Sequence, residues 1–272
     1  MNTNIALIAV VAAAVGAGLF FLLQTMNPET EDMGHIELIL EAQLSDGLSS
    51  AQIDVAIDEI ISVYENRLAE ADLDGVRFEV GEPLQIIAQV PFDVDLFNLK
   101  PMLLRKGELS LHDVVEAGSV PNTILSPKSE SEVMLKDAQD IPYLLLVEPF
   151  LSDNILTSAT LISPENRGGF GSFRIEIKFT EQAAQTFADK IVSLAPDTPI
   201  AFVSDDMVLS APKITESFQD FARDQGSIDT AVIDGNFNED EVRQLVLLLN
   251  TAALPTDMIL LSETIVMPDE GE

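Results

Sequence analysis

The sequence predicts an α+β fold in which one transmembrane helix is followed by two mixed units of helices and strands. Residues 5–23 form an apolar run without a single charge. Residues 36–112 alternate between strand-like and helix-like hydrophobic periods in the order βαββαβ, which is a ferredoxin-like unit. A second alternation of strand-like and helix-like periods follows residue 140. With 47% hydrophobic residues among 272, the chain can build a sizeable core.

The N-terminal run is predicted to be an uncleaved membrane anchor. As a helix, residues 5–23 would extend about 28 Å at ~1.5 Å per residue, which is long enough to cross a bilayer. A cleaved signal peptide is the alternative, but its apolar region is usually shorter and follows basic residues. Here the first basic residue is Arg67, so the positive-inside rule gives no orientation. We expect a short tail inside, a large domain outside and no second span.

The first unit is predicted from its periodicity and its caps. Ser49 and Gln52 form a capping-box pattern, and apolar residues then recur at three- and four-residue steps, as on one buried helix face. Flanking segments alternate as strands do, with a turn at residues 81–83. The expected order is a strand at 36–40, a helix at 49–72, strands at 76–80 and 84–90, a helix at 95–104 and a last strand at 108–112.

The second unit follows a segment at 117–140 that is rich in Ser, Pro and charge, which predicts an exposed connection with little regular structure. Thr180 is expected to cap one helix, and Asn238 with Glu241 another. Asp205 and Asp206 are expected in a solvated hairpin turn. The other expected elements are strands at 143–147, 157–162, 173–179, 200–204, 207–210 and 228–233, with a glycine-rich loop at 167–171.

Composition argues against several classes of function. The net charge of −32 disfavours nucleic acid and anionic surfaces as partners. Because the chain has no Cys, it cannot form disulfides or thiolate metal sites. His35 and His112 lack the spacing of a zinc or nucleophile–base site, so each is expected to have an ordinary structural or surface role. No catalytic, cofactor-binding or metal-binding residues are predicted.

Two further patterns also favour structural roles. Residues 234–245 superficially suggest a calcium loop, but Glu239 stands where that loop needs Gly, and Leu245 replaces the final Glu. Helix capping explains this segment better. The glycines at 167–171 precede a strand and not a helix, so they are not placed to bind a phosphate.

From residue 179 onward, a strand that ends in Phe179 and Thr180 leads into a helix, and three short motifs follow. Their residues are Ser210, Ala211 and Pro212, then Gly235, Asn236 and Phe237, then Ala253, Leu254 and Pro255. In this order they resemble the same succession in SecD, a subunit of the preprotein translocase. Weaker similarity extends back to residues 35–40 and the anchor.

The resemblance implies a ferredoxin-like base with an inserted α+β head, the first periplasmic domain of SecD. Mapped onto this chain, the anchor is residues 1–27, the base is 33–120 and 254–267, and the head is 121–253. The family's hinge would lie at Gly118, Pro121, Ala253, Leu254 and Pro255. Asp206 departs from the Gly that is common in the family. The family's later membrane helices have no counterpart here, so we expect no proton-driven pulling by this chain alone.

Together these features predict an accessory of Sec-dependent export in the inner membrane, with its domain on the periplasmic side. It would bind translocating or unfolded preproteins without catalysis, and Sec translocon subunits or a SecF-like protein would be its partners. The alternative is a membrane-anchored envelope scaffold that reuses this fold for a folded partner. An enzyme is a third and more distant possibility.

Overall fold

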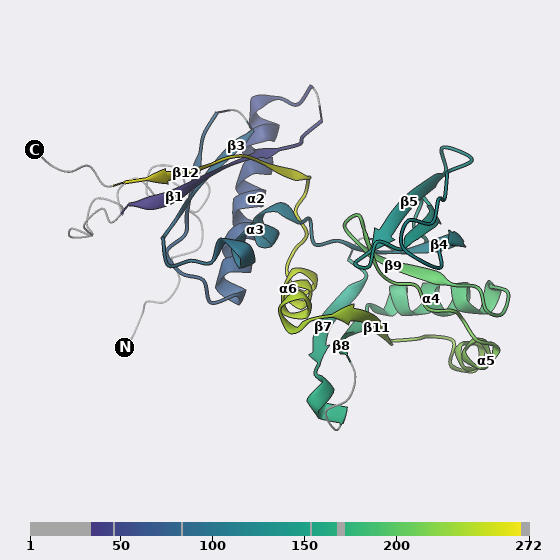
Figure 1. Ribbon diagram of the computed structural model, residues 1–272. Coiled ribbons are helices and arrows are strands. Elements are labelled where there is room, and N and C mark those ends of the chain that lie inside the picture. Colours follow the sequence, from purple (N-terminus) through teal and green to yellow (C-terminus); the bar gives the residue numbers. More distant parts are fainter. Residues whose placement is uncertain (1–33, 46, 83, 153, 168–171, 268–272) are drawn as a thin grey trace, which may run out of the picture.

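The computed structural model describes residues 34–45, 47–82, 84–152, 154–167 and 172–267. These form two lobes joined by two chain segments (Figure 1). We call the lobe that holds both ends of the described chain the base and the other the head. The predicted anchor at residues 1–27 and most of the glycine-rich loop lie outside the described residues. Within the described ranges, no helix is both long and apolar enough to span a membrane.

The base is an antiparallel sheet with two helices on one face. Its strand order is β12-β1-β3-β2. Alternate side chains of β1 and β3 point toward the helices, and Leu38, Leu40 and Ile86 are almost wholly buried there. The elements are β1 (His35–Ala42), α2 (Ser50–Glu70), β2 (Arg77–Val80), β3 (Gln85–Val90), α3 (Leu96–Leu104) and β12 (Met258–Val266).

The last strand of the base differs from the prediction. Residues 108–112 were expected to complete the βαββαβ unit, but that position is taken by β12, which pairs with β1 along its whole length. The segment 109–117 instead forms β4, between β6 and β9 of the head. The physical reason is burial on both faces. Leu111 of β4 belongs to the main head core, whereas Val114 packs against the apolar cluster that Leu145 anchors.

The head combines a closed five-stranded barrel with a three-stranded sheet. The barrel order is β10-β5-β6-β4-β9, and the sheet order is β11-β8-β7. The barrel strands are β4 (Leu109–Ala117), β5 (Glu132–Asp137), β6 (Pro142–Leu146), β9 (Ile200–Ser204) and β10 (Met207–Ser210). The remaining elements are β7 (Leu156–Ile162), a 3-10 turn (Pro164–Arg167), β8 (Phe173–Phe179), α4 (Glu181–Ser193), α5 (Glu216–Gln225), β11 (Thr230–Phe237) and α6 (Glu239–Asn250).

The head core lies where the barrel, the small sheet and α4 meet. The helix predicted after Thr180 is confirmed as α4, and Phe187 lies at the centre of its buried face. The ring of Phe187 lies 5.0 Å from that of Phe179 and 6.3 Å from that of Phe202. These three rings join α4 to β8 and β9, so the two halves of the head share one core.

Candidate functional site at the junction of the two lobes

The two segments that join the lobes run side by side. The first crossover, residues 105–108, leads from α3 to β4, and the second, residues 251–257, leads from α6 to β12. The Leu254 N–H donates to the Lys106 carbonyl at 2.9 Å, which ties the two crossovers together. Any rotation of the head relative to the base must therefore change the conformation of these two segments.

Arg67 of α2 holds both crossovers from the base side. It lies three residues after Tyr64 on the buried stripe of the helix, and its side chain is wholly buried. Nη1 donates to the carbonyls of Met102 and Arg105, both at 2.7 Å. Nη2 donates to the carbonyls of Lys106, at 2.7 Å, and Ala252, at 3.1 Å. Burial lowers the pKa of the guanidinium to about 10, so Arg67 stays charged at neutral pH.

Tyr64 supports the same arrangement one turn earlier. Its hydroxyl donates to the Leu103 carbonyl at 2.8 Å, and burial raises the pKa of this phenol well above its usual value. Tyr64 and Arg67 together bind carbonyls in the last turn of α3, which have no partners within the helix. A cation at this position also complements the partial negative charge of the helix C-terminus.

Asp205 holds the first crossover from the head side. It occupies the turn between β9 and β10 with a φ of +50°, in the left-handed region that Asp tolerates. Its Oδ1 accepts from the N–H groups of Gly107, at 2.9 Å, and Glu108, at 3.4 Å. Burial raises the pKa of this carboxyl above its usual value. The predicted hairpin is confirmed, but the prediction that Asp205 is solvated is wrong, because the crossover covers it.

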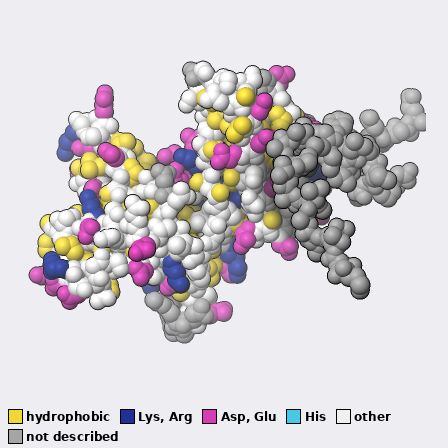
Figure 2. All heavy atoms as spheres, turned by 180° about the vertical axis from the view of Figure 1, so that it is seen from behind, with side chains coloured by type: hydrophobic (Ala, Val, Ile, Leu, Met, Phe, Trp, Pro, Cys, Tyr) yellow, Lys and Arg dark blue, Asp and Glu magenta, His cyan; other side chains and the backbone are white. Residues whose placement is uncertain are grey.

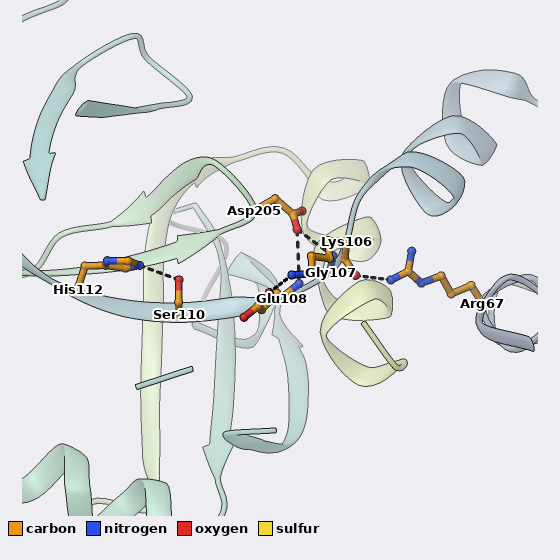
Figure 3. Close-up of polar contacts among 7 residues, drawn as sticks. All are labelled: Arg67, Lys106, Gly107, Glu108, Ser110, His112 and Asp205. Carbon is orange, nitrogen blue, oxygen red and sulfur yellow. Dashed lines mark hydrogen bonds and ion pairs between the residues drawn. The ribbon is translucent and has the colours of Figure 1, made fainter. Parts of the chain in front are cut away.

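Gly107 lets the crossover pass between these two side chains. Its φ of +78° favours glycine, and a Cβ here would lie 2.8 Å from Arg67 Nη2 and 3.2 Å from the Leu248 carbonyl oxygen. Arg67 and Asp205 approach the segment from different sides, one through its carbonyls and the other through its N–H groups (Figure 3). Sequence reasoning missed Arg67, although an arginine on an otherwise apolar helix stripe was the available signal.

The surroundings of the junction offer room but no metal-binding cluster. A cleft of about 570 Å³ opens beside the crossovers and is lined by both lobes. In the described ranges, no group of three or more His, Asp or Glu side chains could hold a metal ion. His112 has two structural contacts in β4: Nδ1 lies 2.8 Å from the Leu146 carbonyl, and Nε2 lies 2.9 Å from the Ser110 hydroxyl. Because the carbonyl only accepts, Nδ1 carries a proton.

Comparison with known proteins assigns the head. A family model described as the SecDF P1 head subdomain matches residues 130–256. Residues 130–256 are therefore similar to a SecDF P1 head subdomain.

Curated relatives support this assignment along more of the chain. SecD of Rhodobacter capsulatus is 29% identical over 189 residues, which cover 69% of this chain and 31% of that protein. SecD of Calditerrivibrio nitroreducens is 24% identical over 256 residues, which cover 87% of this chain and 46% of that protein. The chain thus spans less than half the length of these two relatives.

Solved structures share the fold. The crystal structure of SecDF in its super-membrane-facing form has a TM-score of 0.61 at 18% identity, over 93% of this chain and 34% of that one. A structure described as a membrane component SecDF that enhances protein export has a TM-score of 0.57 at 18% identity, over 83% of this chain and 98% of that one. The described part of the chain therefore has the mixed α+β fold of a SecD periplasmic region.

Two of the three SecD-like motifs meet in space inside the head. Gly235 lies in a bulge of β11, where a Cβ would be 3.1 Å from the Leu209 carbonyl oxygen and 2.5 Å from the Phe237 ring. Phe237 is buried in the head core. Ser210, Ala211 and Pro212 continue from Leu209 at the end of β10, and the Pro212 carbonyl accepts from Ile200 N–H at 3.2 Å. Asn236 shares the bulge.

The predicted hinge residues fall into two groups. Ala253, Leu254 and Pro255 lie in the second crossover, with Leu254 buried in the base core and its two neighbours exposed. Gly118 and Pro121 are in the head, beyond β4, and the Gly118 N–H donates to the Pro142 carbonyl at 2.8 Å. Gly118 and Pro121, which were predicted to be part of the hinge, therefore lie beyond the first crossover. The chain enters the barrel with β4 and so leaves the base before residue 109.

Proposed function

We propose that this chain is an accessory component of Sec-dependent protein export that binds translocating or unfolded polypeptide without catalysing a reaction. The match of residues 130–256 to the SecDF P1 head carries the proposal. A single membrane helix at residues 5–23 would hold the protein in the inner membrane, with both lobes on the periplasmic side. Sec translocon subunits or a SecF-like protein would be its partners.

The surface of the head supports binding of extended polypeptide. Ile124 is 91% exposed and Phe221 is 50% exposed, and both belong to the head. Hydrophobic side chains reach the surface of the head among acidic ones, on the left of the view in Figure 2. An unfolded chain presents apolar side chains and basic groups that such a surface can contact. The binding we propose is therefore apolar in its contacts and favoured by positive charge in the bound segment.

The second crossover is also part of the proposal. We propose that Ala253, Leu254 and Pro255 form the bend about which the head turns on the base. Leu254 is anchored in the base core, whereas Ala253 and Pro255 are exposed, so the bend has one fixed point between two exposed residues.

The proposal is tested by binding. We would titrate the full chain in mild detergent into a fluorescently labelled exported protein, once as a permanently unfolded variant and once folded. The double variant Ile124→Ser with Phe221→Ser is expected to weaken binding of the unfolded form. Phe97→Ser is the matched control, because Phe97 is 76% exposed on α3 of the base. Absence of binding to any unfolded exported protein would overturn the proposal.

Association with partners provides a second test. Isolation of the tagged chain from native membranes is expected to recover Sec channel subunits or a SecF-like protein, compared with a control that carries only residues 1–27. Recovery of a folded envelope protein in place of Sec components would overturn the export role and favour the envelope scaffold.

A further inference from the structure

We propose that Arg67 and Asp205 clamp the first crossover between them, so that the head can turn on the base only after one of the two releases it. The clamp extends the bend proposed above to a specific pair of side chains. Its test measures the arrangement of the lobes without any polypeptide, so its failure would leave the export role standing.

The base half of the clamp is a single buried charge. The four hydrogen bonds of Arg67 reach the last turn of α3, the first crossover and, through the Ala252 carbonyl, the second crossover. A buried guanidinium must keep its acceptors, because an unpaired buried charge is strongly unfavourable. Arg67 therefore fixes both crossovers to α2 for as long as it stays in place.

The head half of the clamp binds the N–H groups of the same segment and not its carbonyls. Asp205 accepts from the backbone N–H groups of Gly107 and Glu108, whereas Arg67 donates to the carbonyls of Arg105 and Lys106. A free pivot would leave such backbone groups to water. Here four consecutive residues are fixed to the base at one end and to the head at the other.

The clamp is closely fitted but incompletely paired. Gly107 leaves no space for a Cβ beside Arg67 Nη2, so the side chain and the crossover are in direct contact. Yet Arg67 Nε and Asp205 Oδ2 are both buried and have no hydrogen-bond partner among the described residues. Each such group carries a desolvation cost that is relieved when water reaches it. Opening therefore loses the made hydrogen bonds but recovers hydration at these two atoms, which makes release accessible.

The test is a distance measurement between the lobes. The sequence has no Cys, so two introduced cysteines are the only labelling sites. We would label Asp58→Cys on α2 and Glu181→Cys on α4, both at exposed positions, with spin labels in the full chain and record distances by pulsed electron paramagnetic resonance. Arg67→Lys keeps the charge but loses the forked geometry that reaches four carbonyls. We expect its interlobe distance distribution to be broader than that of the otherwise unchanged chain.

Controls separate release of the clamp from unfolding. Arg223→Lys on α5 is the matched substitution, because Arg223 is exposed and pairs with Asp220 within one turn. It should leave the distribution narrow. Asp58→Cys with Glu79→Cys reports on the base alone and should not change in any folded variant.

A second variant covers failure of Arg67→Lys to fold. Asp205→Gly tolerates the left-handed turn and removes the side-chain hydrogen bonds to Gly107 and Glu108, so that the backbone bond from the residue 205 N–H to the Glu108 carbonyl remains. This weaker hold from the head side should broaden the same distribution. Interlobe distributions as narrow as that of the parent chain in a folded Arg67→Lys, or in Asp205→Gly should the lysine variant not fold, would overturn the clamp.

Discussion

At the scale of single residues, the closest packing of the junction is found where Arg67 and Asp205 meet the first crossover at Gly107. An arginine and an aspartate approach the same backbone, and the residue between them has no side chain. Local sequence indicates none of this, because the residues come from α2, a hairpin of the head and the first crossover. Only the apolar spacing around Arg67 hints that its side chain is turned inward.

Gly107→Ala tests this crossing point directly. Gly226 provides a matched control, because its φ of +71° is similar to the +78° of Gly107 but a Cβ there would have no atom of the described residues within 4 Å. The left-handed backbone alone should cost about 1–2 kcal/mol in Gly226→Ala. Gly107→Ala should cost more, since Arg67 or the Leu248 carbonyl must also shift. Free energies of unfolding from urea titrations compare the two, and equal losses would contradict the close fit at Gly107.

Asp205 gives a pH-dependent prediction. Because burial raises the pKa of its carboxyl in the folded protein, the charged form is disfavoured by folding. The stabilisation from this group is therefore fully present below the pKa of the unfolded chain and is lost as pH rises through the raised folded pKa. Asp205→Asn keeps an acceptor for Gly107 and Glu108 without the charge. It should match or exceed the parent in stability near neutral pH, and its relative stability should fall with falling pH.

The measurement is denaturant unfolding across that pH range. Asp206→Asn serves as the control, because Asp206 is the exposed neighbour in the same turn. If the stability of Asp205→Asn relative to the parent rose as the pH was lowered, the change would have the wrong sign. That result would contradict a raised pKa at Asp205.

At the scale of elements, predictions succeed where the signal is local and fail where pairing partners decide. The capping boxes at Ser49 with Gln52 and at Asn238 with Glu241 are both confirmed. By contrast, β5 lies inside the segment predicted to be irregular. Its own sequence does not indicate a strand, and pairing with its neighbours in the barrel stabilises one there. No helix was predicted at α5, although Thr215 caps its start and Gly226 ends it. Both signals are visible in the sequence and could have predicted this helix.

One element-level contact protects a sheet edge. The Asn250 side chain at the end of α6 donates to the Ala159 carbonyl at 2.8 Å and accepts from the Ala159 N–H at 2.7 Å. Ala159 lies on β7, the outer strand of its sheet, so the amide replaces the partner that a further strand would offer. Asn250→Ala should destabilise the protein by about 1–3 kcal/mol, because two backbone groups lose their partners. It should also increase aggregation.

Chemical denaturation and light scattering after partial unfolding measure the two effects. Gln185→Ala on α4 removes an exposed amide elsewhere in the head and should change neither by much. Equal behaviour of the two variants would contradict a protective role for Asn250.

At the scale of the whole molecule, the order of elements predicted the kind of base but not the strand that completes it. Two segments with strand-like alternation, β4 and β12, were available after α3, and periodicity does not state which of them pairs with β1. The choice depends on contacts far apart in sequence, since the entire head lies between α3 and β12. For the same reason part of the hinge was predicted near residues 118–121, whereas the first crossover is formed by residues 105–108, and local sequence does not indicate the clamp.

Net charge acts on the whole molecule and sets the last prediction. The formal charge of −32 destabilises the compact chain through self-repulsion, and added salt screens this repulsion over a distance of about 10 Å at 0.1 M. Salt also weakens ion pairs, but pairs such as Lys136 with Asp140 and Arg243 with Glu239 are exposed, and each contributes at most about 1 kcal/mol. Repulsion should therefore dominate the response to salt.

We expect the free energy of unfolding to rise as sodium chloride is added and to level off once the repulsion is screened. Urea titrations of the full chain at increasing salt measure this, because urea is uncharged and does not itself alter ionic strength. The same series in sucrose provides the control, since an uncharged osmolyte stabilises without screening and should show no early plateau. A free energy of unfolding that stays level or falls in sodium chloride would mean that the ion pairs outweigh the repulsion, and that the acidic side chains are spaced widely enough to coexist without a stability cost.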